Sequence, residues 1–450
     1  MKTVLFRLLV LLLVSVLALS LGCNKSSDDD DDSADDDAAD DDTTLDDDET
    51  DDDTSVDDDT SVDDDTSVDD DTSVDDDTSV DDDTSVDDDT SVDDDTTIDD
   101  DTSVDDDTVL CECEIVRKPY LQRVTQNGIK ILWNTLPKGN SVVEWGPTEA
   151  LGQTATMDGL RMGHKIELTG LDTGATYYYR VRSCEAVSDI YQFHTAPEFD
   201  TPFTFTAYSD SQDNPDIHGR IAALVKAIGP DVMIHSGDSV STGWTPSEFD
   251  TKFFEPLQEV LPETPIYIGI GNHEGESVFY YTTFDFGDFN GRYSFTYGNT
   301  FFVAIDSQLL MFPWSEQYLW LQDQLLSDAA QNAEFRVAFF HQPPYSEGWD
   351  TWEGNEQVRN YIAPLFEDLG VDAVFNGHTH DYERGTLNGV TWFIVGGGGG
   401  ALDTQYRDFE HIVAYASVHH FVKAEVDCTT MTFTAIDEWG AEFDTYQITH

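Results

Sequence analysis

The feature that most constrains the fold is a set of five apolar runs, each leading to residues of the types that serve as metal ligands in proteins. The runs are 203–209, 231–235, 265–271, 335–340 and 371–377, and they lead to Asp210, Gly237-Asp238, Asn272-His273-Glu274, His341 and His378-Thr379-His380. Short apolar runs bounded by glycine and polar residues are typical of buried strands in a parallel sheet. The carboxyl ends of such strands share one edge, where α/β proteins bind ligands. The sequence therefore predicts a metal site at that edge.

Asp238 has a special place because it follows Gly237 on a predicted tight turn, where both carboxylate oxygens can point outward. Phosphoryl transfer uses two cations about 3.5–4 Å apart that clamp the phosphate and convert a bridging water into hydroxide. Cations that close need a bridging anion, and the Asp238 carboxylate fits this role. His378 and His380 alternate along an extended segment, so each can bind one metal. We expect a two-metal site with Asp238 as the shared ligand.

Residues 198–450 alternate between strand and helix patterns, which predicts a layered α/β domain with two central sheets flanked by helices. Helical spacing covers 216–228, 247–260, 315–328 and 356–369, and the first of these ends at Gly229-Pro230. A hairpin is predicted from 293–297 and 301–305, and closing strands from 418–426, 431–436 and 442–448.

Residues 111–197 show the period-two alternation of strands, with no helical segment between them. The strand patterns are 128–133, 141–145, 165–168 and 176–182. They predict an all-β sandwich ahead of the α/β domain. Trp133 and the stretch from Leu171 to Tyr177 resemble a fibronectin type III-like module.

Residues 1–22 have the pattern of a secretory signal peptide, with Lys2 and Arg7 before a short apolar run. The four residues that end at Cys23 resemble a bacterial lipobox, with Ser20 where leucine is usual. Two interpretations follow: lipidation of Cys23 with anchoring in the bacterial cell envelope, as an outer membrane or surface lipoprotein, or a plain cleaved signal with secretion. Both predict export.

Residues 23–110 form an aspartate-rich stretch in which Asp-Asp-Asp-Thr-Ser-Val recurs from Asp51 onward. So dense a run of like charge cannot bury a core, which predicts a disordered, self-repelling stalk. The alternative is a stretch that binds calcium weakly, because carboxylate oxygens suit that ion. It lacks the glycine and closing glutamate of a defined calcium loop.

The folded part is acidic as well. Residues 1–110 hold 45 of the 93 acidic and 3 of the 21 basic residues, which leaves a net charge of −30 for residues 111–450. Without a basic patch, nucleic acid is excluded as a partner. An exported chain meets an oxidising compartment, so pairing among Cys111, Cys113, Cys184 and Cys428 is plausible.

The blocks at the five strand ends resemble the calcineurin-like metallophosphoesterase superfamily in order and residue type. The preceding sandwich and the string Gly377 to Arg384, which ends His380-Asp381-Tyr382-Glu383-Arg384, resemble the purple acid phosphatase branch. The resemblance covers about residues 117–450. It implies that one metal takes Asp210, Asp238 and His380, and the other Asp238, Asn272, His341 and His378. It also implies that His273 stands beside the leaving group, where it donates a proton or holds a phosphate oxygen. Asn272 can likewise bind the substrate.

The sequence departs from that branch in three places. Purple enzymes have a metal-binding tyrosine where this chain has Ser241, so the purple absorption band should be absent. Many relatives have histidine where this chain has Gln212, so the metals stay open among iron, zinc, manganese and magnesium, as divalent or trivalent ions. Plant members carry substrate-contacting histidines after the His341 block, whereas this chain offers Tyr345, Trp349 and Asp350.

Two further residues have two interpretations each. Arg384 either reaches the substrate phosphate or, with Tyr382, supports the loop that carries His378 and His380. His235, on an apolar strand, is either a packed residue or a ligand, and packing is favoured. For the whole chain we expect a metal-dependent phosphatase of small phosphomonoesters. The alternatives are a phosphodiesterase or nucleotide hydrolase on the same metals, and a surface binding protein whose site has decayed.

Overall fold

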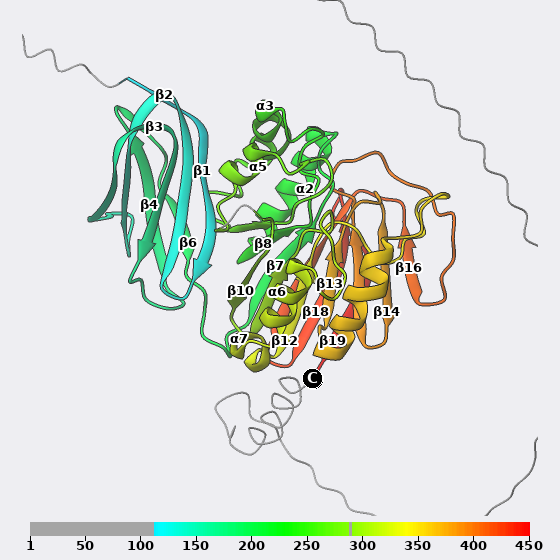
Figure 1. The fold of residues 1–450 in the computed structure, drawn as a ribbon. Coiled ribbons are helices and arrows are strands. Elements are labelled where there is room, and N and C mark those ends of the chain that lie inside the picture. The colour runs from blue at the N-terminus through cyan, green and yellow to red at the C-terminus, as the bar shows by residue number, and fades with distance from the viewer. Residues whose placement is uncertain (1–111, 288–289) are drawn as a thin grey trace, which may run out of the picture. The chain divides into compact units, whose positions relative to one another are not determined.

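Figure 1 shows the protein as a computed structural model that describes residues 112–287 and 290–450. The predicted signal peptide, Cys23 and the stalk lie outside the described residues. Within the described part, none of the helices is long and apolar enough to span a membrane. Cys113 and Cys428 are free thiols, whereas Cys184 is disulfide-bonded.

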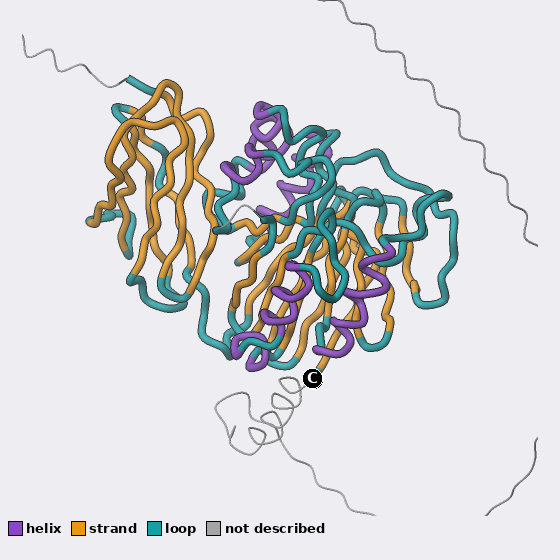
Figure 2. The backbone as a smooth tube through the Cα atoms, in the orientation of Figure 1, coloured by secondary structure: helices purple, strands orange, loops and turns teal. Residues whose placement is uncertain are grey.

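The first folded segment consists of strands and loops, as Figure 2 shows, and this confirms the predicted all-β domain. Its strands are β1 (Glu114–Thr125), β2 (Gly128–Gly146), β3 (Gln153–Thr169), β4 (Thr176–Ser183), β5 (Ala186–Val187) and β6 (Tyr191–His194). The prediction of separate strands at 128–133 and 141–145 is wrong, because β2 continues through both. A register shift between β2 and β3 after Asn134 accommodates Pro137 without ending the strand.

The α/β domain contains two sheets. The six-stranded sheet has the order β19-β18-β17-β7-β8-β9, and the seven-stranded sheet has the order β10-β11-β12-β13-β15-β14-β16. Their bounds are β7 (Phe203–Tyr208), β8 (Val232–His235), β9 (Ile266–Ile268), β10 (Tyr293–Tyr297), β11 (Thr300–Ala304), β12 (Phe335–Phe339), β13 (Ala373–Asn376), β14 (Tyr382–Leu387), β15 (Val390–Val395), β16 (Ile412–Ala416), β17 (His420–Asp427), β18 (Thr430–Asp437) and β19 (Glu442–Thr449). The predicted hairpin is β10 with β11, and the three predicted closing strands are β17 to β19.

The helices are α2 (Pro215–Ile228), α3 (Pro246–Glu248), η1 (Phe249–Phe254), α4 (Glu255–Leu257), α5 (Val278–Thr283), α6 (Glu316–Leu325), α7 (Asp328–Asn332), η2 (Val358–Ile362) and α8 (Ala363–Leu369). The side chain of Asn214 caps the start of α2, and Gly229 ends it in a left-handed conformation, as its sequence predicts. The continuous helices predicted at 247–260 and 356–369 are wrong in detail, because π-helical turns interrupt both segments.

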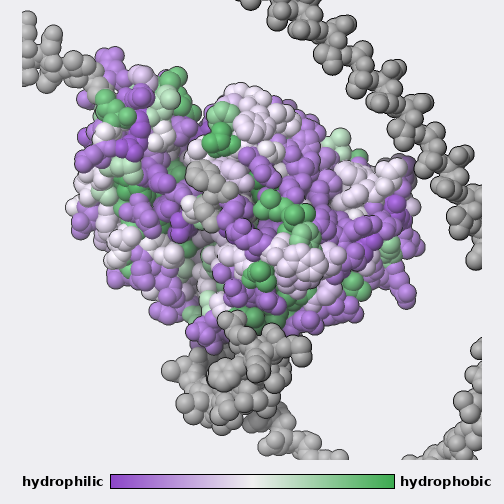
Figure 3. Space-filling view, viewed as in Figure 1, coloured by the Kyte–Doolittle hydropathy of each residue, from purple (hydrophilic) through white to green (hydrophobic). Residues whose placement is uncertain are grey.

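The two sheets pack face to face around a buried core that includes Phe205 on one sheet and Phe302 and Phe375 on the other. Helices cover both outer faces: Ile221 of α2 packs outside the first sheet, and Leu321 of α6 outside the second. This arrangement confirms the predicted pair of central sheets flanked by helices. The face shown in Figure 3 is mostly hydrophilic, in keeping with the acidic composition of this region.

Candidate metal centre

The structure places the predicted ligands just beyond the carboxyl ends of parallel strands. Asp210, Asp238 and Asn272 follow β7, β8 and β9, and His341, His378 and His380 follow β12 and β13. The first three strands are parallel to one another, and so are β12 and β13. The predicted ligands therefore lie at the carboxyl ends of strands in both sheets, three from each sheet.

Three of these residues have a backbone that L-amino acids rarely adopt. Asp210, Asp238 and His378 have φ values of 58°, 55° and 76°. A left-handed backbone at a residue other than glycine costs free energy and is concentrated at functional sites. The turns also need glycine beside them: a Cβ on Gly271 would lie 2.1 Å from Asp238 Oδ1, and one on Gly377 would lie 2.2 Å from Asp210 Oδ2. The local sequence thus positions these ligands by close backbone approach.

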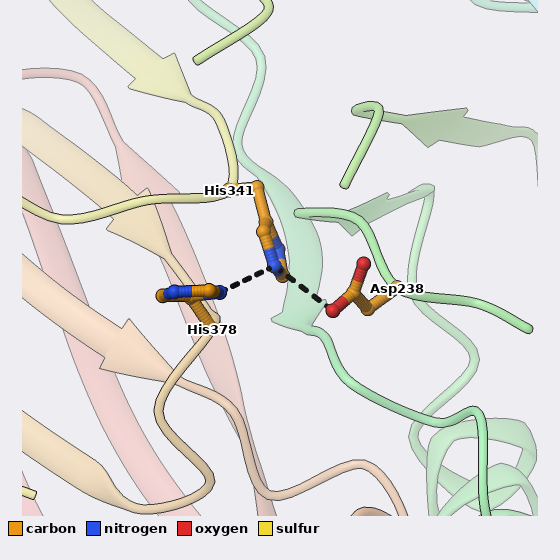
Figure 4. Close-up of side chains that lie close together, drawn as sticks. All are labelled: Asp238, His341 and His378. Carbon is orange, nitrogen blue, oxygen red and sulfur yellow. Dashed lines mark hydrogen bonds and ion pairs between the residues drawn. The ribbon is translucent and has the colours of Figure 1, made fainter. Parts of the chain in front are cut away.

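Four of the predicted ligands form one compact group. His341 Nε2 lies 3.0 Å from Asp238 Oδ2, 3.0 Å from Asn272 Oδ1 and 3.2 Å from His378 Nδ1. Figure 4 shows His341 between Asp238 and His378, the three coming from separate segments of the chain. Ligand atoms of these three residues all lie within 4.8 Å of one another. Asp238 and His341 are fully buried.

The chemistry of this group fits a cation. His341 Nδ1 lies 3.2 Å from the Ser236 carbonyl oxygen, so it carries the ring proton and leaves a lone pair on Nε2. Lone pairs of Nε2, Asp238 Oδ2 and Asn272 Oδ1 therefore face one another, which is repulsive unless a positive charge lies among them. Burial lowers the pKa of His341, but the carboxylates of Asp238 and Asp210 outweigh burial and raise it to about 9. The site attracts either a proton or a metal ion.

A second group lies beside the first. His380 Nε2 is 3.5 Å from Asp210 Oδ1 and 3.3 Å from Gln212 Nε2. His380 Nδ1 lies 2.9 Å from the carbonyl oxygen of Ala401, so Nε2 is the nitrogen that faces Asp210. The backbone N–H of His378 donates to Asp210 Oδ2 at 3.0 Å, which links the two groups. All six predicted ligands are therefore brought together in two neighbouring sets.

The Asp238 carboxylate is more constrained than its sequence context predicts. Oδ1 accepts the backbone N–H of His273 at 2.9 Å, so only Oδ2 faces the histidines. The expectation that both oxygens point outward is wrong, because the turn that follows β9 supplies a donor to one of them. Asp238 would therefore contribute Oδ2 to holding a cation.

Glu274 connects the turn at Asp238 with the turn at Gly271. Its fully buried carboxylate accepts the N–H groups of Gly271 at 2.7 Å, Asp238 at 2.9 Å and Ser239 at 2.7 Å, and the Ser239 hydroxyl at 2.7 Å. Glu274 therefore supports the turn that carries Asp238. Burial and the negative charge of Asp238 raise the pKa of Glu274.

The structure distinguishes the other predicted residues. His273 is on the open side of the centre: its side chain is 40% exposed, Nδ1 lies 2.8 Å from the Ser241 carbonyl oxygen, and Nε2 lies 3.9 Å from Asp238 Oδ2. Arg384 pairs with Asp444 at 2.6 Å and stacks on Tyr446. This favours the supporting interpretation of Arg384 over contact with phosphate. His235 is fully buried against Phe253, as expected for a packed residue.

Two tryptophans contact the centre: Trp349, which the sequence offers in place of the plant members' histidines, and Trp352, which sequence reasoning did not single out. The rings of Trp349 and Trp352 lie 4.8 and 4.7 Å from the His378 imidazole, centroid to centroid. Both tryptophans belong to the loop in which plant members carry substrate-contacting histidines. The lack of those histidines in this chain is the sequence signal that other residues of the loop contact the centre.

Comparison with known proteins gives the same assignment domain by domain. Residues 203–382 match the calcineurin-like phosphoesterase family, and residues 118–195 match the purple acid phosphatase N-terminal domain. Purple acid phosphatase 15 of Arabidopsis thaliana is 25% identical over 284 residues, covering 52% of this chain and 53% of the relative. Purple acid phosphatase 13 of the same plant is 29% identical over 196 residues, covering 38% and 35%. The chain thus spans about half, or less, of the length of these relatives.

Solved structures show the same fold. A purple acid phosphatase, PPD1, from yellow lupin seeds superposes with a TM-score of 0.66 at 19% identity, covering 74% of each chain. PhoD superposes with a TM-score of 0.57 at 13% identity, covering 74% of this chain and 93% of the other.

Proposed function

Since the chain joins a purple acid phosphatase N-terminal domain to a calcineurin-like phosphoesterase domain, we propose that it hydrolyses phosphate monoesters at a dinuclear metal site. The observation that carries the proposal is that Asp238 Oδ2, Asn272 Oδ1 and His378 Nδ1 lie 3.0, 3.0 and 3.2 Å from His341 Nε2. Such a donor set holds a cation, and the neighbouring Asp210 and His380 provide for a second.

The residues of the chain have distinct tasks in this reaction. Two bound cations would neutralise charge on the phosphate and supply a water of lowered pKa. Asp238 and His341 hold one side of the centre rigidly, because both are buried and hydrogen-bonded. Asn272 and His273 are exposed and lie where a substrate can enter. The Ser241 carbonyl accepts the Nδ1–H of His273 and fixes the ring. In the imidazolium form of this ring, which carries protons on both nitrogens, Nε2 can give its proton to the leaving oxygen and return to the neutral form.

The test is turnover of p-nitrophenyl phosphate by the full chain loaded in turn with iron, zinc, manganese and magnesium. Asp238→Asn and His378→Ala should each lower kcat/KM by about 100-fold or more, as removal of a single stabilising group does. His194→Ala, an exposed histidine of the sandwich, is the matched control and should leave the rate unchanged. A folded, metal-loaded protein that turns over no phosphoester would overturn the proposal.

The same assay separates the alternatives. Faster turnover of bis(p-nitrophenyl) phosphate than of the monoester would assign the centre to diester cleavage. Fewer than two metal ions per chain together with no turnover would favour a binding protein with a decayed site.

We also propose that the protein is exported and anchored through a lipid on Cys23, with the aspartate-rich stretch as a spacer between membrane and enzyme. The support is the charged and apolar pattern of residues 1–22 and the small residues before Cys23. Mass spectrometry of the mature N-terminus tests it. An unmodified start downstream of Cys23 would leave a secreted enzyme without an anchor.

A further inference from the structure

The loop that follows β12, residues 343–355, places an aromatic surface at the border of the metal centre. The indoles of Trp349 and Trp352 both contact the His378 ring, and their centroids lie 5.5 Å apart. Both side chains are partly exposed. His378 in turn has Nδ1 3.2 Å from His341 Nε2. The indoles therefore pack against a predicted metal ligand, and their partly exposed sides can contact a substrate.

This aromatic surface is held in place by its backbone. Arg407 donates hydrogen bonds to the carbonyl oxygens of Trp349, Asp350 and Trp352. The two ends of the loop are also hydrogen-bonded to each other. A surface fixed in this way loses little conformational freedom when a ligand stacks on it, so more of the stacking free energy remains for binding.

The charge of the loop limits which ligands it accepts. Residues 343–355 contain three acidic residues and no lysine or arginine. Asp350 and Glu353 are exposed. Arg359 pairs with Glu353 at 2.9 Å, and the guanidinium of Arg407 is hydrogen-bonded to carbonyl oxygens of the loop. The loop therefore offers no free positive charge to further phosphates, and an uncharged ring needs none.

The other side of the centre is aromatic too. Trp244 is 59% exposed, and its indole N–H donates to the Gly275 carbonyl oxygen at 3.2 Å, on the loop that carries His273. An isolated exposed tryptophan needs no explanation. Exposed or half-exposed indoles therefore lie beside His378 and against the loop that carries His273, an arrangement that suits a ligand with an aromatic face.

We propose that Trp349 and Trp352 form a stacking surface that selects phosphomonoesters whose leaving group carries an uncharged planar ring, either a nucleobase or an aryl group. The inference rests on the proposed phosphatase function. It names the substrate class and assigns the two tryptophans to specificity, because they would contact the leaving group and not the phosphate.

The test compares substrates that differ only in the ring. AMP and ribose 5-phosphate have the same primary alkoxide as leaving group, so a difference between them reports on the base. Trp349→Leu and Trp352→Leu should each lower kcat/KM for AMP by about fivefold or more, the usual loss for one stacking partner, and change that for ribose 5-phosphate by less than about twofold. Trp349→Phe should restore much of the AMP activity. Trp439→Leu, which removes an exposed indole stacked on Arg220, is the matched control.

Two further arms identify the ring and the charge. Phenyl phosphate in place of AMP shows whether an aryl group is selected as well. The readout is the ratio of kcat/KM in each leucine variant to kcat/KM in the wild type, because the basicity of the leaving group affects both equally. ADP should have a higher KM than AMP; KM is compared because the anhydride of ADP is chemically more reactive than the ester of AMP. Equal losses for AMP and ribose 5-phosphate would mean that the indoles only support His378, and would overturn the proposal.

A binding measurement separates this inference from the proposed function. Adenosine, which has no phosphate, should quench the tryptophan fluorescence of the full chain, and each leucine variant should weaken the quenching. If the metal-loaded protein turns over no phosphoester but shows this pattern, the phosphatase function fails and the stacking surface stands. Turnover of phosphomonoesters without adenosine quenching and without a preference for AMP would overturn the stacking surface alone.

Discussion

His341 Nε2 lies 3.0 Å from Asp238 Oδ2, although the two residues belong to the ends of strands in different sheets. His341 follows β12 of the seven-stranded sheet, and Asp238 follows β8 of the six-stranded sheet. A cation bound between them therefore cross-links the carboxyl edges of both sheets.

The first prediction is that metal binding stabilises the fold as a whole. A ligand at 100 times its dissociation constant adds about 2.7 kcal/mol to the free energy of unfolding. For a domain of this size that corresponds to a rise in Tm of roughly 5–10 °C. Scanning calorimetry with and without zinc measures it. His341→Ala should abolish the rise and His194→Ala should retain it; a rise that survives in His341→Ala would place the ion elsewhere.

The second prediction concerns Glu274. Glu274→Gln keeps the size of the side chain but turns an NH₂ group toward backbone N–H donors, leaving buried donors without acceptors. We expect a loss of about 2 kcal/mol in the free energy of unfolding and a 10- to 100-fold weaker metal affinity. Chemical unfolding and a metal titration measure these two effects. The neighbouring exposed residue offers the control Glu276→Gln, and equal behaviour of the two variants would contradict the supporting role.

The third prediction is a pH dependence that originates in the sandwich. Burial, with a smaller contribution from Arg161, lowers the pKa of His164 to about 4. Its ring stacks on Trp133 and lies 2.8 Å from the hydroxyls of Thr135 and Ser141. In the unfolded chain His164 binds a proton near pH 6.5, so the unfolded state takes up more protons and stability falls as the pH drops from 6.5 to 4.

The size of this effect follows from about 1.4 kcal/mol for each pKa unit, which gives about 3 kcal/mol for His164 at its full extent. His164→Gln should flatten the curve of unfolding free energy against pH over that range. Unfolding measured at several pH values, with His194→Gln as the exposed control, checks the expectation. An unchanged slope in His164→Gln would assign the dependence to other buried histidines.

The fourth prediction is spectroscopic. Ser241 stands where purple enzymes carry the tyrosine whose phenolate gives the iron site its colour. The Ser241 hydroxyl donates to the Gln212 carbonyl oxygen at 2.9 Å and accepts a hydrogen bond from Lys252. Serine has no phenolate to transfer charge to iron. The iron-loaded protein should therefore lack the visible absorption band, with the metal-free protein as reference. A strong visible band in the loaded protein would mean that another tyrosine reaches the metal.

The sequence predicts the convergence of these residues well because their positions depend on local rules. Each follows an apolar run, and parallel strands end at a common edge, so residues such as Asp238 and His341 converge whatever the remaining loops do. The alternation of strands and helices predicts the layers in the same way.

Contacts between distant segments escape such rules. Arg384 binds Asp444, a partner on the last strand that no local pattern indicates. The role of Glu274 depends on where the turn at Asp238 meets the turn at Gly271. The loop that brings Trp349 and Trp352 to His378 is held in part by Arg407, which lies far along the chain.

The left-handed backbone at Asp210, Asp238 and His378 also limits how this centre can be lost through mutation. Glycine and asparagine tolerate that conformation, whereas valine and isoleucine do not. A copy released from selection for activity would first accumulate glycine or asparagine at these three positions and would keep its turns intact. Pseudoenzymes descended from such a chain should therefore be recognisable by small or amide residues at the three turns, within an otherwise unchanged scaffold.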